Sequence, residues 1–419
     1  MSVEEAAAPP IAWRTWAACG LMLFATALNY MDRQALAQQA TEVQAELHLN
    51  DEQYGELEYW FGIAFAAGGV VTGWLVDRVS LRWMYPAILL AWSVVGFLTG
   101  GATSYRELLI YRVLLGFFET GQWPCALAAS QRLLSRGNRA LGNSILQSGA
   151  SLGAIATPLV VLALNSGDAG GWRIPFRVIG ALGVVWVAAW LVLIRPGDLD
   201  GPQEESDKRA DAPPSDPATT IRRVAVLIVV VIMINVCWQY FRAWMPKMLA
   251  KEHGYDRNAV QLFSSAYYVA AGIGCLAAGY LSRQLFVRGW SVHGARLATF
   301  AGCVALTSTS LAAAYLPASP LLLGLLLAIG FGSLGQFPPY YAFTQEISAR
   351  RMGLVTGLFS LAAWGATAPM HPAIGRWIDR TGSYAAPNAL AGLAPVVALL
   401  ALIALWDLPR RSDRSGPSA

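Results

Sequence analysis

Apolar stretches of about twenty residues recur along the whole chain and alternate with short charged or turn-forming segments. A helix of that length rises far enough to cross roughly 30 Å of hydrocarbon. The stretches are too long and too numerous for the core helices of a soluble protein. The pattern therefore predicts an all-α membrane protein with twelve transmembrane helices near residues 13–37, 54–76, 84–103, 107–131, 140–164, 172–194, 224–246, 260–282, 295–316, 320–343, 353–375 and 387–406.

A polar segment divides these helices into two sets of six. It is rich in Pro, Asp, Glu and Ser and poor in apolar side chains, which is typical of a solvated linker. We therefore expect a tail at 1–12, a six-helix half at 13–194, the linker at 195–223, a second half at 224–406 and a tail at 407–419.

An internal repeat supports this division. GWLVDR at 73–78 ends the second predicted helix, GYLSRQ at 279–284 ends the eighth, and an arginine-bearing loop follows each. The repeat predicts two halves related by pseudo-symmetry, an architecture that lets a carrier rock about a central site.

Charge is scarce and unevenly distributed. Charged residues make up 13% of the chain, against about 25% in soluble domains. Lys and Arg gather on alternate loops, the linker and the C-terminal tail. The first loop on the other side of the membrane contains acidic residues but no Lys or Arg. The positive-inside rule therefore predicts a multi-pass protein of the cell membrane, plasma or bacterial inner membrane, with both termini in the cytoplasm. A net charge of +4 reflects this topology, and we expect the lipid bilayer but no nucleic acid as a partner.

Motifs for enzyme chemistry are lacking. GxSxG at 149–153 and GxGxxG at 330–335 lie inside predicted membrane helices, where closely spaced glycines let backbones touch. The five cysteines show no metal or redox spacing, and the four histidines are widely separated. We expect no enzyme activity, no cofactor and no metal site.

Five ionisable residues stand inside predicted membrane helices: Asp32, Arg33, Arg112, Glu119 and Arg242. An unpaired charge near the bilayer centre costs about 2.5–3.5 kcal/mol. We therefore expect these side chains to face an interior cavity and to pair. Arg112 and Glu119 are seven residues apart, which puts both on one helix face, roughly 10 Å from each other along the axis.

The charges suggest a site for an anion and a proton. Asp32 is expected to pair with one arginine, which leaves another arginine free to hold a substrate anion. A carboxyl group away from water favours its neutral form, so Asp32 or Glu119 could carry a coupling proton. Arg33 and Arg242 would then flank the site from opposite halves. Alternatively, these charges only fasten helices together, and Arg242 reaches the outer rim beside Lys247.

Aromatic and amide side chains near the charges could complete the site. Trp238 and Gln239 precede Arg242, while Tyr340 and Trp364 lie close to prolines expected to interrupt helices. Such side chains line polyol sites through stacking and hydrogen bonds. Each could instead be a packing residue. The prolines expected to interrupt helices are Pro124, Pro158, Pro338, Pro339, Pro369 and Pro372.

The loop after the second predicted helix resembles the signature loop of the major facilitator superfamily, through Gly73, Asp77, Arg78 and Arg82. The resemblance implies that this loop gates the conformational change. Within the superfamily, NYMDR at 29–33, RVLLGFFETGQWP at 112–124 and GWRIPFRVIGALG at 171–183 are similar to the anion:cation symporter family.

That narrower resemblance implies roles for individual residues. Asp32 and Glu119 would be the proton-coupling carboxylates, Arg33 and Arg112 would bind substrate and pair charges, and Tyr30 would be an aromatic substrate contact. Three positions depart from the family pattern. Phe65 stands near a position that is often Tyr in sugar-acid carriers, Ser80 stands where the first signature loop usually has Gly, and Arg283 stands where the second-half loop usually has Asp.

The sequence thus predicts a monomeric secondary transporter. We expect symport of a small organic anion, such as a hexuronate or hexonate, with a proton by alternating access. One alternative is an exchanger of organophosphates or other organic anions in the same superfamily. Another, of a different class, is a membrane nutrient sensor that binds its ligand without transport.

Overall fold

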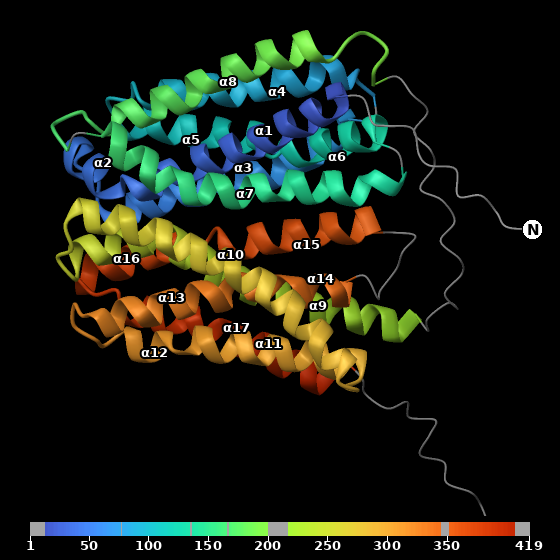
Figure 1. Ribbon diagram of the computed structural model, residues 1–419. Helices are drawn as coiled ribbons and strands as arrows, with labels where there is room; N and C mark the ends of the chain where they lie inside the picture. The colour runs from blue at the N-terminus through green and yellow to red at the C-terminus, as the bar shows by residue number, and fades with distance from the viewer. Residues whose placement is uncertain are drawn as a thin grey trace, which may run out of the picture.

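The computed structural model describes residues 13–76, 78–134, 136–165, 167–199, 217–344 and 352–406. Within these ranges the chain is helical, with no strand (Figure 1). The first eight helices are α1 (Trp13–Gln38), α2 (Ala40–Leu47), α3 (Asp51–Val76), α4 (Leu81–Thr99), α5 (Tyr105–Glu119), α6 (Gln122–Leu133), α7 (Arg136–Leu164) and α8 (Arg173–Leu193). The remaining helices are α9 (Pro217–Lys251), α10 (Arg257–Val287), α11 (Val292–Ser308), α12 (Ser310–Ala313), α13 (Pro320–Gly335), α14 (Phe337–Thr344), α15 (Met352–Thr367), α16 (Met370–Thr381) and α17 (Ala385–Leu405).

The all-α membrane prediction is confirmed, with differences in detail. Each predicted stretch contains a helix, but four stretches contain two helices each, and α2 lies where no helix was predicted. Eight of the described helices are long and apolar enough to cross a membrane. The number of twelve crossings therefore stays a prediction.

Prolines explain most of the interrupted helices. Pro124 has no amide hydrogen to donate to the Thr120 carbonyl, and the break between α5 and α6 falls at Thr120 and Gly121. Prolines likewise lie beside the breaks between α13 and α14 and between α15 and α16. Pro158 lies inside the continuous α7, so the break expected there is wrong.

Helices α1–α8 form one bundle and α9–α17 a second bundle that lies against it (Figure 1). We call these the first and second bundles. Helix α1 begins and α17 ends at the same end of the molecule, which we call the near end. The opposite end, the far end, carries the connections from α1 to α3, from α9 to α10 and from α16 to α17.

Two of the helices that start at the far end, α5 and α10, have polar side chains as N-terminal caps. The Ser104 side chain accepts a hydrogen bond from the Glu107 amide at the start of α5, and Asp256 does the same for Ala259 in α10. Such caps satisfy amide groups that have no partner within the helix. They fix where the chain turns back into the membrane.

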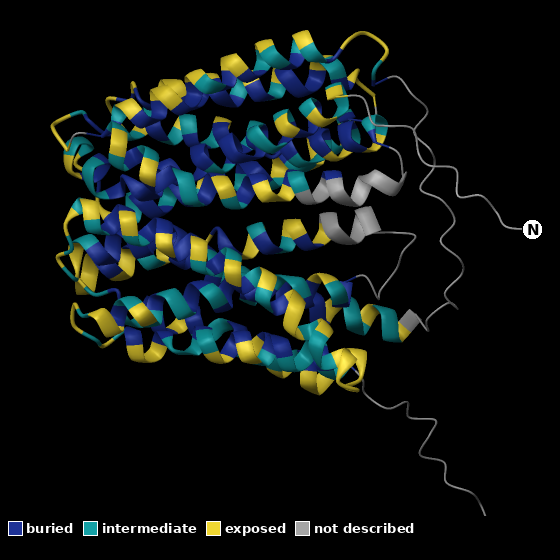
Figure 2. Cartoon of the chain, in the orientation of Figure 1, coloured by how far each residue is buried: buried dark blue, intermediate teal, exposed yellow. Residues whose placement is uncertain are grey.

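Burial is inverted relative to a soluble protein. Asp32, Arg112 and Glu119 are buried, whereas Val192 on α8 is 82% exposed and Leu276 on α10 is 77% exposed. Figure 2 shows exposed positions along the outer faces of both bundles. This distribution suits a molecule whose outer faces meet hydrocarbon and whose charges face inward.

At the far end, ion pairs and hydrogen bonds join the bundles. Lys247 on α9 pairs with the Asp51 carboxylate on α3. The Asp379 carboxylate on α16 accepts hydrogen bonds from the backbone amides of Asp51, at 2.8 Å, and Glu52, at 2.7 Å. Arg376 adds an ion pair of 2.9 Å to the Glu52 side chain. Asp379 thus provides a negative charge at the N-terminus of α3, where the helix dipole favours one.

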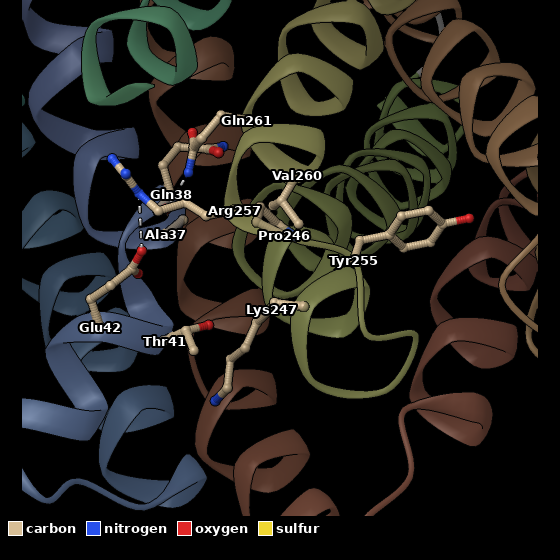
Figure 3. Close-up of a pocket in the computed structure, with 11 residues that line it drawn as sticks. Ala37, Gln38, Thr41, Glu42, Pro246, Lys247, Tyr255, Arg257, Val260 and Gln261 are labelled. Carbon is tan, nitrogen blue, oxygen red and sulfur yellow. Dashed lines mark hydrogen bonds and ion pairs between the residues drawn. The ribbon is translucent and has the colours of Figure 1, made fainter. Parts of the chain in front are cut away.

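A cavity of about 220 Å³ lies beside these contacts, between α1 and α2 of the first bundle and α9 and α10 of the second (Figure 3). Arg257 reaches across it to Glu42 at 3.5 Å, and it also donates to the carbonyl oxygens of Val161, at 3.1 Å, and Asn165. The Gln261 amide donates to the Gln38 carbonyl at 2.7 Å. These contacts close the far end around the cavity.

Helix α2 is itself held to α8 by one acid. Glu46 accepts hydrogen bonds from Arg173 at 2.7 Å, Trp172 Nε1 at 2.7 Å and the Gly170 amide at 2.9 Å. The hydrogen bond from Arg173 is the main cause that lowers the pKa of Glu46 below its ordinary value. The contact therefore depends on an ionised Glu46.

Candidate functional site

Six ionisable side chains from four helices meet where the two bundles face each other. Helix α1 supplies Asp32 and Arg33, α3 supplies Glu58, α5 supplies Arg112 and Glu119, and α9 of the second bundle supplies Arg242. All six are buried, with Arg33 the most exposed at 6%. We call them the charge cluster. Arg112 and Glu119 lie on the same buried face of α5, as their spacing predicted.

Arg33 and Glu119 form one ion pair of the cluster. The Arg33 Nε and Nη2 atoms lie 3.3 and 3.2 Å from Glu119 Oε2. Asn29, one turn earlier on α1, accepts from Arg33 Nη2 at 3.2 Å and donates to the Glu119 carbonyl at 3.1 Å. This network locks the middle of α1 to the end of α5.

Aromatic rings surround the Arg33 guanidinium. Its Cζ atom lies 4.7 Å from the ring centre of Phe65, 5.2 Å from Tyr30, and 5.6 Å from both Phe61 and Trp364. These distances are within the range of cation–π attraction. Trp364 comes from α15, so the second bundle supplies one wall. The structure thus brings together three predicted site residues: Tyr30, Arg33 and Trp364.

Glu58 forms the other centre of the cluster. Its Oε1 accepts from Arg112 Nη2 at 3.2 Å, and its Oε2 accepts from Arg242 Nη2 at 2.5 Å. Arg242 Nε also donates to Gln239 Oε1 at 2.7 Å. Among the described residues, Arg112 Nε, Arg112 Nη1 and Arg242 Nη1 have no hydrogen-bond partner. Arg242 therefore points into the bundle contact and does not reach the outer rim.

Asp32 differs from the other two acids of the cluster. It is 1% exposed, yet neither carboxylate oxygen accepts a hydrogen bond from any residue that the structure describes. The expected pairing of Asp32 with an arginine is therefore wrong, because Glu119 and Glu58 take the arginines. Gly96 on α4 lies beside it, and a Cβ atom at that position would come within 2.7 Å of Asp32 Oδ1.

Two other predicted site residues have different surroundings. Trp238 is partly buried and packs edge-on against Tyr268 at 6.1 Å, one turn from Arg242. Tyr340 is 3% exposed and packs against Tyr341 and Phe359, in an apolar cluster that is separate from the one around the charges. The position of Tyr340 does not support a contact with substrate.

The predicted gating loop lies at the near end. Arg78 donates to the Trp74 carbonyl at 2.9 Å, and Arg82 donates to the Ile194 carbonyl, also at 2.9 Å. Gly73 has open space where a side chain would be. Asp77 falls outside the described residues. The described contacts of Arg78 and Arg82 stay within the first bundle.

Glu58 is the functional candidate that the sequence analysis missed. It stands about two turns inside α3 but near the start of the predicted helix 54–76, two residues after Glu56, so the sequence alone does not distinguish it from acids at a helix end. His371 was noted only as one of four scattered histidines. The structure places it beside the cluster, where its Nδ1 accepts from Trp244 Nε1 at 3.1 Å.

The charge cluster is balanced when all six groups are ionised, because three arginines face three carboxylates. Such a balanced cluster can bind one more anion through the open arginine donors, or one more proton on a carboxylate. Each event alone leaves an uncompensated charge in a medium of low polarity, which is costly. The two events together leave the charge unchanged.

Comparison with known proteins gives a family match over most of the chain. The family model described as Major Facilitator Superfamily matches residues 22–368. A probable sulfoacetate transporter of Cupriavidus necator is 26% identical over 404 residues, which cover 91% of each chain. A hexuronate transporter of Escherichia coli K12 is 24% identical over 413 residues, which cover 94% of this chain and 93% of the relative.

Solved structures share the fold. A bacterial homologue of the human lysosomal transporter Spinster, in an inward-facing and unoccupied conformation, superposes with a TM-score of 0.73. The alignment covers 94% of this chain and 95% of that chain, at 18% sequence identity. At this identity the similarity concerns the arrangement of helices.

Proposed function

The chain belongs to the major facilitator superfamily, and from that membership we propose that it carries a sugar acid, such as a hexuronate or hexonate, across the cell membrane in symport with a proton. It is a multi-pass membrane transport protein and not an enzyme. The charge cluster, in which arginines with open donors face a carboxylate without a partner among the described residues, carries the proposal.

The anion would bind to Arg112 and Arg242. Their open donors, Arg112 Nε and Nη1 and Arg242 Nη1, have no partner in the described part of the chain. These N–H groups can donate hydrogen bonds to the two oxygens of a carboxylate. Tyr30 and Trp364 beside Arg33 offer ring faces on which the carbon side of a sugar can stack. Gln239 and Trp238 would approach from the second bundle.

The proton would bind to Asp32 or Glu119. Asp32 accepts no hydrogen bond from any described residue, and Glu119 uses only its Oε2 atom, so its Oε1 is equally open within the described ranges. A substrate anion in the balanced cluster would leave one excess negative charge. A proton on either carboxylate removes that excess charge. The substrate anion and the proton together therefore cross the low-dielectric interior at a lower free-energy cost than the anion alone.

The described contacts suggest how access alternates. Ion pairs close the far end, and the exposed basic residues Arg78, Arg283 and Arg288 at the near end support the proposal that this end faces the cytoplasm. The residues described here would then form a state closed toward the outside. Rocking of the two bundles about the charge cluster would expose it to the other side.

Proteoliposomes with a pH gradient test the proposal. Purified protein should accumulate labelled D-glucuronate when the outside is more acidic, and a protonophore should abolish the accumulation. Glu119→Gln should still exchange labelled for unlabelled substrate but lose accumulation. Glu107→Gln, a partly exposed acid at the start of the same helix, is the matched control and should accumulate normally. Full accumulation by Glu119→Gln would contradict the coupling role.

One observation favours a second candidate function. Two arginines from opposite bundles around one carboxylate would also suit a sulfonate or a doubly charged phosphate group. One relative is a probable sulfoacetate transporter. An exchanger of such anions would accumulate substrate against a counter-anion gradient and ignore pH. Transport by either route would also exclude a sensor that only binds its ligand.

A further inference from the structure

The Glu58 carboxylate already occupies the place that an organic anion would take. Each oxygen faces one guanidinium, with Arg112 in the same bundle and Arg242 in the other. The carboxylate is 2% exposed, so water does not compete for these contacts. An incoming carboxylate seeks the same two cations with the same planar pair of acceptor oxygens.

We propose that Glu58 is an intramolecular competitor of the transported anion, and that the substrate must displace it from Arg242 to bind. This inference rests on the proposed function, because it assigns the substrate carboxylate to the same arginines. An anion on the open donors of Arg112 and Arg242 would lie beside Glu58, which holds the Nη2 atoms of the same guanidinium groups. Two carboxylates so close together repel each other in a buried site, so Glu58 must leave Arg242. The net affinity for an anion is therefore the difference between its own contacts and those of Glu58.

Competition of this kind sets a threshold of affinity that an anion must pass. A small anion such as acetate has only its carboxylate to offer, and Glu58 already provides one, so acetate gains little by displacing it. A sugar acid adds hydroxyl contacts and ring stacking, which Glu58 cannot replace. Glu58 lowers the affinity for both anions by the same factor, and only an anion with such additional contacts then binds tightly enough to occupy the site.

Displacement would also act on the bundle contact. The ion pair between Glu58 and Arg242 joins α3 to α9 inside the membrane. The ion pair of Asp51 with Lys247 and the hydrogen bonds to Asp379 join the two bundles at the far end. When Glu58 releases Arg242, the fixed contact is lost and the bound anion takes over the link between Arg112 and Arg242. A ligand shifts a conformational equilibrium only through differential contacts, so the cost of opening the far end would fall only as far as the new link is weaker than the old ion pair.

The test compares anion binding to the full chain and its variants by isothermal titration calorimetry at pH 7 and constant ionic strength. Glu58→Gln keeps the shape of the side chain but removes its charge. It should bind D-glucuronate and acetate each about tenfold more tightly, and the ratio of the two affinities should stay the same, because both anions lose the same competitor. Glu58→Asp keeps the charge but draws it away from Arg242, so a smaller gain of about threefold is expected.

Two comparisons separate competition from other effects. Asp51→Asn weakens another bridge between the bundles, away from the arginines, and should leave the affinities for D-glucuronate and acetate unchanged. An equal effect in Asp51→Asn would overturn the proposal, because the gain would then come from looser bundles. Weaker binding of both anions to Glu58→Gln would also overturn it, since Glu58 would then orient the arginines.

The outcomes also separate this inference from the proposed function. If the unaltered chain does not bind D-glucuronate but Glu58→Gln still raises the affinity for acetate, the substrate assignment fails and the role of Glu58 stands. If the unaltered chain binds D-glucuronate and Glu58→Gln does not raise that affinity, the substrate assignment stands and the role of Glu58 fails. If Glu58→Gln does not elute as a folded species in size-exclusion chromatography, Glu58→Asp gives the test. A higher affinity for D-glucuronate in Glu58→Asp supports competition, and an equal or lower affinity overturns it.

Discussion

The guanidinium of Arg33 on α1 lies 5.6 Å from the ring centre of Trp364 on α15, so a cation of the first bundle rests against an aromatic ring of the second. The same ring packs against Phe65 at 4.8 Å. The contact is therefore part of the boundary between the bundles and part of the candidate binding site. It must change whenever the bundles move apart.

Removal of the Trp364 ring should weaken binding of a sugar acid. We expect Trp364→Ala to raise the Kd for D-glucuronate about tenfold, because a stacking face and a cation–π contact are lost. Trp364→Phe should keep most of the affinity. Trp377→Ala removes an equally large ring from an exposed face of α16 and should leave the Kd unchanged. Titration calorimetry on the purified chain gives these values, and equal losses in both alanine variants would contradict the role.

The isolated position of Asp32 predicts an unusual effect on stability. Asp32→Asn removes a buried carboxylate that has no hydrogen-bond partner among the described residues, so it breaks no ion pair and should lower the unfolding temperature much less than the loss of a paired charge does. Arg33→Gln, its neighbour on α1, leaves Glu119 without its cation and should destabilise the protein by about 3–5 kcal/mol. Thermal unfolding in detergent compares the two. A large loss for Asp32→Asn would mean that the carboxylate has a structural partner.

The far-end contact of Asp379 should control which side is open. Asp379→Asn weakens the bond from one bundle to the helix terminus of the other, so the open population at the far end should increase. Asp256→Asn is the matched control, because Asp256 caps its own helix within the second bundle. Each change should cost about 1 kcal/mol of stability. Distances between spin labels on α3 and α16 should broaden in Asp379→Asn and stay narrow in the control.

The contact between Glu46 and Arg173 should depend on pH. A lowered pKa means that Glu46 contributes stability above its unfolded pKa, about 4.3, and loses it as the pH falls through the folded value. Glu46→Gln should therefore lower the unfolding temperature at pH 7, at a cost of about 1 kcal/mol or less. The difference from the unaltered chain should shrink below about pH 4.5. Arg173→Gln should reproduce the loss, and a difference that persists at low pH would contradict the assignment.

The class of protein and the residues worth examining could be predicted from the amino-acid sequence alone. Insertion of a helix into a bilayer depends largely on the composition of that helix, so apolar stretches and rare charges could be read without any partner. Asp32, Arg33, Arg112, Glu119 and Arg242 were found in this way, and in the structure all five are buried and all but Asp32 form ion pairs there. The prolines also predicted most helix breaks, because the loss of an amide hydrogen is a local effect.

The pairing of the charges depends on how the helices pack. Glu119 and Arg33 are 86 residues apart, and Glu58 and Arg242 are 184 apart, so no local pattern could pair them. Asp32 was therefore given a partner that it does not have, and Glu58 was overlooked, while the role of Tyr340 in the site stays a prediction. Electrostatic pairing depends on distance in space, and in a bundle of helices that distance is fixed by packing between segments far apart in the chain.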